Sequence, residues 1–171
     1  IYIDSTTIML GGNNIVYFNA MELNPKLKIV IPRNLKHVYA KSLVFLSDTL
    51  YFSNNKQLNK VIRFKEEAYH TSFAPSDQQR IFAIALNGNQ IYISTLKTVY
   101  KLEQDTLIPV ESFVNTPFRK FRFFQGVLVG ITHDYQLIVG FPTLNENQFR
   151  IQTILEDCSW MDMNYIFHSN V

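Results

Sequence analysis

The strongest constraint on the fold is a motif of three apolar runs that recurs four times along the 171 residues. In each copy a short polar turn joins the first two runs, and a longer polar segment leads to the third. The runs of the successive copies are 7–10, 15–18 and 27–31; 43–46, 50–52 and 61–64; 82–86, 91–93 and 99–102; and 127–131, 137–139 and 149–151. Repetition at this spacing indicates an array of small structural units rather than a particular chemistry.

Each copy is predicted to be a unit of antiparallel β-strands. The turn Asn87-Gly88 tolerates the positive φ that a tight hairpin needs, and the 14 Phe and 9 Tyr residues favour strands. Fourth strands are expected at 36–40, 69–73, 107–113 and, before the last copy, 121–123. Tyr17, Tyr51 and Tyr92 are expected at equivalent positions of their units. The sequence therefore predicts an all-β fold with about four blade-like repeats of antiparallel strands, a β-propeller or part of one.

Composition places the chain among globular proteins, with 47% hydrophobic and 18% charged residues. No linker divides it, so a single domain over 1–171 is predicted, with one short helix over 157–167. Because the sequence opens on the strand-like Ile1-Tyr2-Ile3, we expect it to be a fragment of a longer chain. No apolar stretch is long enough to span a membrane.

The single cysteine, Cys158, excludes an internal disulfide and any zinc site with several cysteines. A lone cysteine fits a reducing compartment, so the predicted location is intracellular, either cytoplasmic or nuclear. The formal charge of +2 is too small to indicate a nucleic-acid partner by bulk electrostatics.

The copies resemble degenerate β-propeller repeats of the RCC1-like and WD40-like kinds. The resemblance is carried by the pattern of strand, polar turn and Tyr-containing strand in 42–55, and again in part in 131–140. It implies a non-catalytic interaction scaffold within a larger assembly, or alternatively an RCC1-like exchange factor that regulates a small GTPase. The pattern transfers no functional residue to this chain.

The sequence gives little support for catalysis. It lacks nucleotide-binding, zinc-protease and hydrolase motifs. His37, His70, His133 and His168 lie far apart in the sequence, and His133-Asp134 is predicted to be a turn rather than a catalytic dyad. A propeller glycoside hydrolase is disfavoured because no carboxylate recurs at an equivalent position in successive copies. No catalytic residue, cofactor or metal is therefore predicted, and the protein is not expected to be an enzyme.

The predicted partner-binding residues are Arg119, Lys120 and Arg122, which lie among four aromatic residues in 118–124. On a strand, Phe121 and Phe123 would fill the core while Lys120 and Arg122 face the other side. The alternative is an ordinary strand with a solvated face. The cations predict a protein partner with an acidic surface; an RNA backbone is a less favoured possibility.

Overall fold

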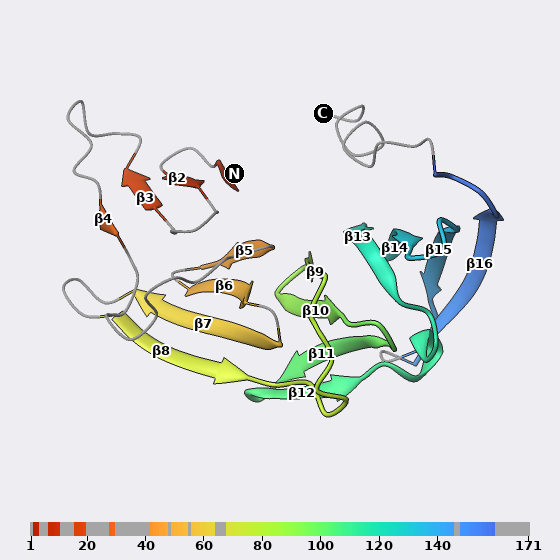
Figure 1. The fold of residues 1–171 in the computed structure, drawn as a ribbon, viewed down its shortest axis with the longest axis horizontal. Helices are drawn as coiled ribbons and strands as arrows, with labels where there is room; N and C mark the ends of the chain where they lie inside the picture. Colours follow the sequence, from red (N-terminus) through yellow and green to blue (C-terminus); the bar gives the residue numbers. More distant parts are fainter. Residues whose placement is uncertain are drawn as a thin grey trace. The chain divides into compact units, whose positions relative to one another are not determined.

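A computed structural model describes residues 2–3, 7–10, 16–19, 28–29, 42–47, 49–54, 56–63, 68–145 and 148–159. The described elements are β-strands and one short 3-10 turn, which confirms the all-β prediction. The strands form four antiparallel sheets of four strands each, and the strands of every sheet follow one another in chain order (Figure 1). The chain forms two compact units, Ile1–Ala74 and Pro75–Val171.

The first unit contains two of the sheets. Their strands are β1 (Tyr2–Ile3), β2 (Thr7–Leu10), β3 (Val16–Asn19) and β4 (Lys28–Ile29), then β5 (Leu43–Leu46), β6 (Thr49–Asn54), β7 (Gln57–Arg63) and β8 (Ala68–Phe73). In the second of these sheets Leu50, Phe52 and Leu58 are buried. The buried Asn59 amide donates to the carbonyl of Phe52 at 3.4 Å, so its burial is compensated by a hydrogen bond.

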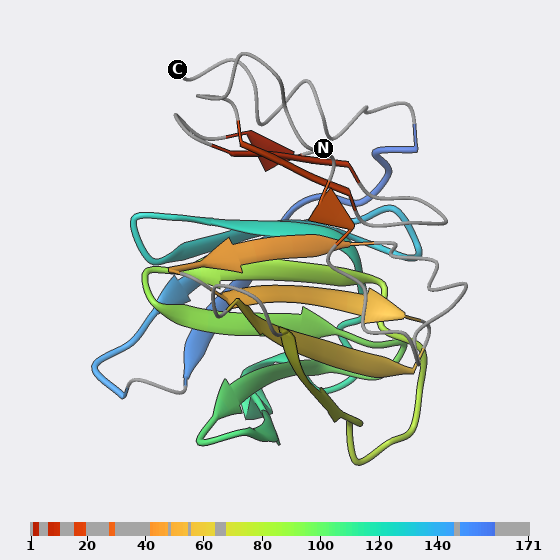
Figure 2. The same ribbon diagram turned by 90° about the vertical axis from the view of Figure 1, so that its left-hand side faces the viewer.

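The second unit contains the other two sheets. Their strands are β9 (Ala83–Asn87), β10 (Gln90–Ser94), β11 (Val99–Glu103) and β12 (Thr106–Pro109), then β13 (Phe118–Phe124), β14 (Val127–Thr132), β15 (Leu137–Pro142) and β16 (Phe149–Leu155). The 3-10 turn η2 (Glu111–Phe113) leads from one sheet to the other. Figure 2 shows the antiparallel strands β9 to β12 in green.

The core of the second unit lies between its two sheets. Tyr92 and Val99 from one sheet pack with Phe118, Phe121 and Leu128 from the other, and Phe113, Ile138 and Phe149 complete the same buried cluster. Gly130 and Gly140 make close packing possible here. A Cβ on Gly130 would lie 2.8 Å from that of Phe121, and one on Gly140 would lie 3.0 Å from the Phe113 ring.

The strands expected from the repeated runs are present, but the equivalence of the four copies is wrong. In the second and third copies the runs are the first three strands of a sheet, whereas in the first and fourth they are the last three. Tyr51 and Tyr92 therefore lie on second strands and Tyr17 on a third strand. Every hairpin of an antiparallel sheet repeats the same pattern of apolar run and turn, so the pattern does not show where a sheet begins.

Several finer predictions also change. The two turn residues between β9 and β10 are Gly88 and Asn89 rather than Asn87 and Gly88, because Asn87 pairs with Gln90. Of the expected strand 107–113, only the first part is strand, in β12, and η2 follows. Residues 157–159 are not helical; the rest of the predicted helix and the expected strand 36–40 lie outside the described residues.

The propeller itself is not confirmed. Each sheet is open, with an outer strand on either side that pairs with one neighbour, so none of the four described sheets closes on itself. The prediction of one domain over 1–171 stays a prediction.

Candidate partner-binding surface

In the second unit, several loops lie together at one end of the strands of its two sheets. In a sheet whose strands follow one another in antiparallel order, the loop between the second and third strands lies at the same end as the entry and the exit of the chain. We call this end the loop edge, formed by residues 75–82, 95–98, 114–117, 133–136 and 156–159.

Hydrogen bonds join these five segments in series. Thr95 Oγ1 donates to Asp77 Oδ2 at 2.7 Å, Asn115 N to Lys97 O at 2.7 Å, His133 N to Pro117 O at 3.1 Å, and Cys158 N to Tyr135 O at 2.8 Å. Loops that bond to one another lose less freedom on binding than independent loops do. The loop edge is therefore a connected surface rather than a set of separate tips.

Three large apolar side chains are exposed on the loop edge. The exposed fractions are 45% for Leu96, 55% for Val114 and 38% for Tyr135. The bond between Asn115 N and Lys97 O brings the segments of Leu96 and Val114 together. Exposed apolar side chains beside polar groups on rigid loops are typical of protein-binding surfaces.

Arg119 is held beside this surface by Tyr135. A register shift in the pairing of β13 with β14 lies between Phe118 and Lys120, so Arg119 is the bulged residue. Its guanidinium donates from Nη1 to the Tyr135 hydroxyl at 3.0 Å and lies 5.6 Å from the centre of the Tyr135 ring. Among the three cations predicted to bind a partner, Arg119 is thus joined to the loop edge through Tyr135.

Lys120 and Arg122 are exposed on β13 itself. Alternate residues of a strand share a face, so these two point to the same side, opposite Phe121. The bulge also explains why Phe118 and Phe121 are both buried although they are three residues apart. The binding role of all three cations stays a prediction.

His133 anchors the β14–β15 loop. Its ring packs edge-on against Phe82 with 4.3 Å between centroids, and Arg80 lies over the Phe82 ring at 5.4 Å. Burial and then the nearby Arg119 lower the pKa of His133, and Asp134 opposes them only in part. The imidazole is therefore neutral at pH 7. The Asp134 carboxylate accepts a hydrogen bond from Thr132 Oγ1, as expected of a turn aspartate rather than a dyad partner.

Cys158 fastens the end of β16 to the same loop. Both its backbone N and its Sγ donate to the carbonyl of Tyr135, at 2.8 Å and 2.6 Å. Burial, followed by the adjacent Asp157, raises the pKa of the thiol, so the thiol stays protonated and unreactive. This cysteine has a structural role.

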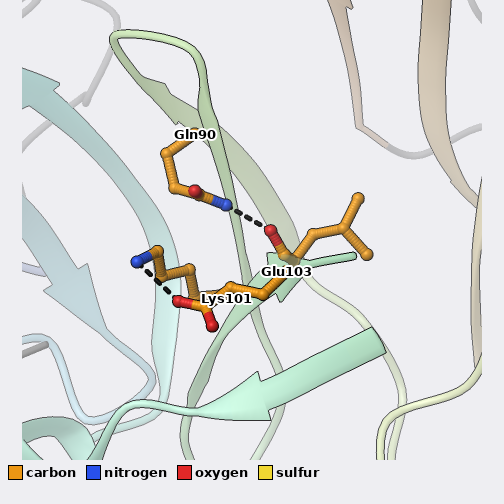
Figure 3. Close-up of polar contacts among 4 residues, drawn as sticks. Gln90, Lys101 and Glu103 are labelled. Carbon is orange, nitrogen blue, oxygen red and sulfur yellow. Dashed lines mark hydrogen bonds and ion pairs between the residues drawn. The ribbon is translucent and has the colours of Figure 1, made fainter. Parts of the chain in front are cut away.

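A small cavity of about 270 Å³ lies away from the loop edge. It is lined by Lys101, Glu103, Ile108, Pro109, Val110, Glu111, Asn145 and Gln148. Lys101 Nζ and Glu103 Oε1 are paired at 2.7 Å, and the nearby Gln90 amide donates to the carbonyl of Leu102 (Figure 3). The ion pair largely cancels the charge of its two members, and Glu111 adds one further carboxylate to the lining.

Metal ligation finds no support in the part of the chain that the structure describes. Among those residues, no group of three or more His, Cys, Asp or Glu side chains could hold an ion. His37 and His168 lie outside the described residues, and His70 lies in β8.

In the part of the chain that the structure describes, no helix is long and apolar enough to cross a membrane.

Comparison with known proteins identifies a shared fold and no family. No protein-family model and no curated protein matches the chain. A solved structure does match: the extracellular domain of a protein described as a hybrid two-component system from B. thetaiotaomicron. The TM-score is 0.64 at 17% identity, over 91% of this chain and 22% of that chain. At this identity the likeness shows the fold alone, and this chain spans about a fifth of the longer one.

The resemblance to RCC1-like and WD40-like repeats is wrong. The sheets are separate and open, and the matching structure is described as the extracellular domain of a two-component system. The alternation of apolar strands and polar turns is a property of antiparallel sheets in general, so it does not identify one repeat family.

Proposed function

We propose that this chain is a non-catalytic protein-interaction module that binds its partner through the loop edge of the second unit. The observation that carries the proposal is the presence of Leu96, Val114 and Tyr135 as exposed apolar side chains on loops tied together by hydrogen bonds. A few such anchors on a rigid surface supply most of the affinity of a protein interface.

The proposal includes a larger assembly. The face of sheet β13–β16 that carries Phe121 is covered by β9, β10 and η2. Its other face carries Val129, Val139 and Phe141, which are only half-buried. An apolar sheet face normally packs against another layer. This feature and the length of the matching solved chain support the view that the four sheets belong to a larger array of such sheets.

The partner in this proposal is a protein. The loop edge holds acidic residues such as Asp134 and Asp157 beside its cations, and this mixed charge does not favour a nucleic-acid backbone. An intracellular location is kept as part of the proposal on the ground of the single cysteine.

Affinity capture with matched surface variants tests the proposal. The double variant Leu96→Ser, Val114→Ser removes two exposed apolar anchors, and Leu144→Ser removes a fully exposed leucine from the turn at the opposite edge. We expect the double variant to reduce the recovery of bound proteins at least about tenfold, the effect of losing roughly 1.4 kcal/mol. The control should bind as the wild type does. Equal recovery with the double variant would refute the proposed surface.

A further inference from the structure

We infer that Arg119 and Tyr135 together form a preorganised anchor for a carboxylate group, supplied by an acidic side chain of the protein partner. The inference rests on the proposed function, since it names the chemistry that the loop edge recognises. It is carried by the way in which two unusual backbone features bring these two side chains together.

The first feature is the bulge of β13. Counted back from the buried Phe121, regular alternation would place Arg119 on the core face, because alternate residues of a strand share a face. With the bulge, Arg119 is exposed although Phe118 and Phe121 are both buried. Bulges commonly redirect a side chain next to a functional site.

The second feature is the backbone of Tyr135, whose φ of +63° is uncommon for a bulky residue. This backbone conformation is held in place by hydrogen bonds, because the Tyr135 carbonyl accepts two of them from the buried Cys158. Tyr135 N also donates to the Thr132 carbonyl at 3.2 Å. Backbone strain that the surroundings hold in place is concentrated at binding and catalytic sites.

The result is an exposed guanidinium with most of its donors available. Arg119 has five N–H groups, and its contact with Tyr135 uses one nitrogen on a neutral hydroxyl. In the described part of the chain Arg119 forms no ion pair, and the neighbouring Asp134 is hydrogen-bonded to Thr132. A fixed guanidinium fork matches the two oxygens of a carboxylate, and its fixation lowers the entropy cost of binding.

One cation of this kind suits a carboxylate better than a phosphate. A phosphate monoester carries nearly two negative charges and is typically met by more than one cation. Lys120 and Arg122 lie on the strand beyond the bulge, on the face opposite Phe121, whereas Tyr135 belongs to the loop edge. The anchor therefore fits an Asp or Glu side chain whose apolar neighbours contact the rest of the loop edge.

The test is a titration of the 171-residue protein with sodium acetate, with ionic strength held constant by sodium chloride. The side-chain N–H signals of the arginines are followed by nuclear magnetic resonance and assigned from Arg119→Lys, Arg122→Lys and Arg150→Lys. Acetate should shift the Arg119 signal saturably, in the millimolar range, and leave Arg122 and Arg150 nearly unchanged. Tyr135→Phe, which keeps the ring and removes the hydroxyl, should weaken the binding about threefold or more.

Three results would overturn the inference. The first is an Arg119 signal that responds to acetate no more than those of Arg122 and Arg150. The second is a Tyr135→Phe protein that binds acetate as tightly as the wild type. The third is inorganic phosphate binding more tightly than acetate at the same ionic strength. None of these results depends on Leu96 or Val114, so loss of capture in their double variant would still support the interaction surface itself.

Discussion

Replacing Phe121 by alanine should destabilise the protein more than any change on the exposed side of β13. Phe121 is 3% exposed and lies between Phe118, at 5.7 Å between ring centroids, and Phe123, at 6.0 Å. A buried phenylalanine removes about 150–250 Å² from water. At about 25 cal/mol per Å² this gives an upper limit of roughly 4–6 kcal/mol. Measured Phe→Ala losses in cores suggest about 3–5 kcal/mol.

The control is Phe124→Ala on the same strand, because Phe124 is 41% exposed and should cost less than about 1 kcal/mol. Urea unfolding measures both free energies, and an unchanged slope shows that the midpoint shift reports stability. If the alanine variant does not fold, Phe121→Leu should still show a loss of up to about 1.5 kcal/mol. A loss below about 1.5 kcal/mol for Phe121→Ala, or equal losses for both alanine variants, would refute the packing argument.

The remaining predictions concern two glycines and a histidine. Gly88→Val should lower the free energy of unfolding by about 1 kcal/mol or more, measured by thermal melting, because φ is +56° there while no atom obstructs a Cβ. Gly130→Ala should cost about 1–3 kcal/mol in the same assay, because its Cβ would meet the Phe118 ring, and an unchanged melt would contradict the packing. Folding lowers the pKa of His133 below its usual value of 6.5. The neutral imidazole therefore stabilises the folded state fully at pH values above 6.5. The wild type should therefore lose stability relative to His133→Gln as pH falls below 6.5, and parallel pH profiles would disagree with this.

Much of the strand content could be predicted because apolar runs and turn residues act locally. The runs at 43–46, 82–86 and 127–131 all fall on strands, with bounds shifted by about one residue. The grouping of strands into sheets could not be predicted, because the contacts that end one sheet and begin the next are non-local. Phe123 shows the same limit. Alternation along the strand predicts that Phe123 is buried like Phe121, but Phe123 is only partly buried, at the margin of the core cluster.

The candidate surface was only partly visible in the sequence. The pattern of cations among aromatics drew attention to Arg119, but a bulge cannot be inferred from it, so Arg119 was not separable from Lys120 and Arg122. Leu96, Val114 and Tyr135 give no sequence signal, since single apolar residues in loops are common. Only the hydrogen bonds between loops show that these positions share one edge.

Hydrogen exchange of the protein with and without its captured partner tests the proposed surface most directly. The account predicts slower exchange in the bound state at 95–98, 114–117 and 133–136, on the loop edge. Exchange should not change at the opposite edge, in the turns at 88–89, 104–105 and 125–126. Slower exchange confined to those turns, with the loop edge unaffected, would contradict the account.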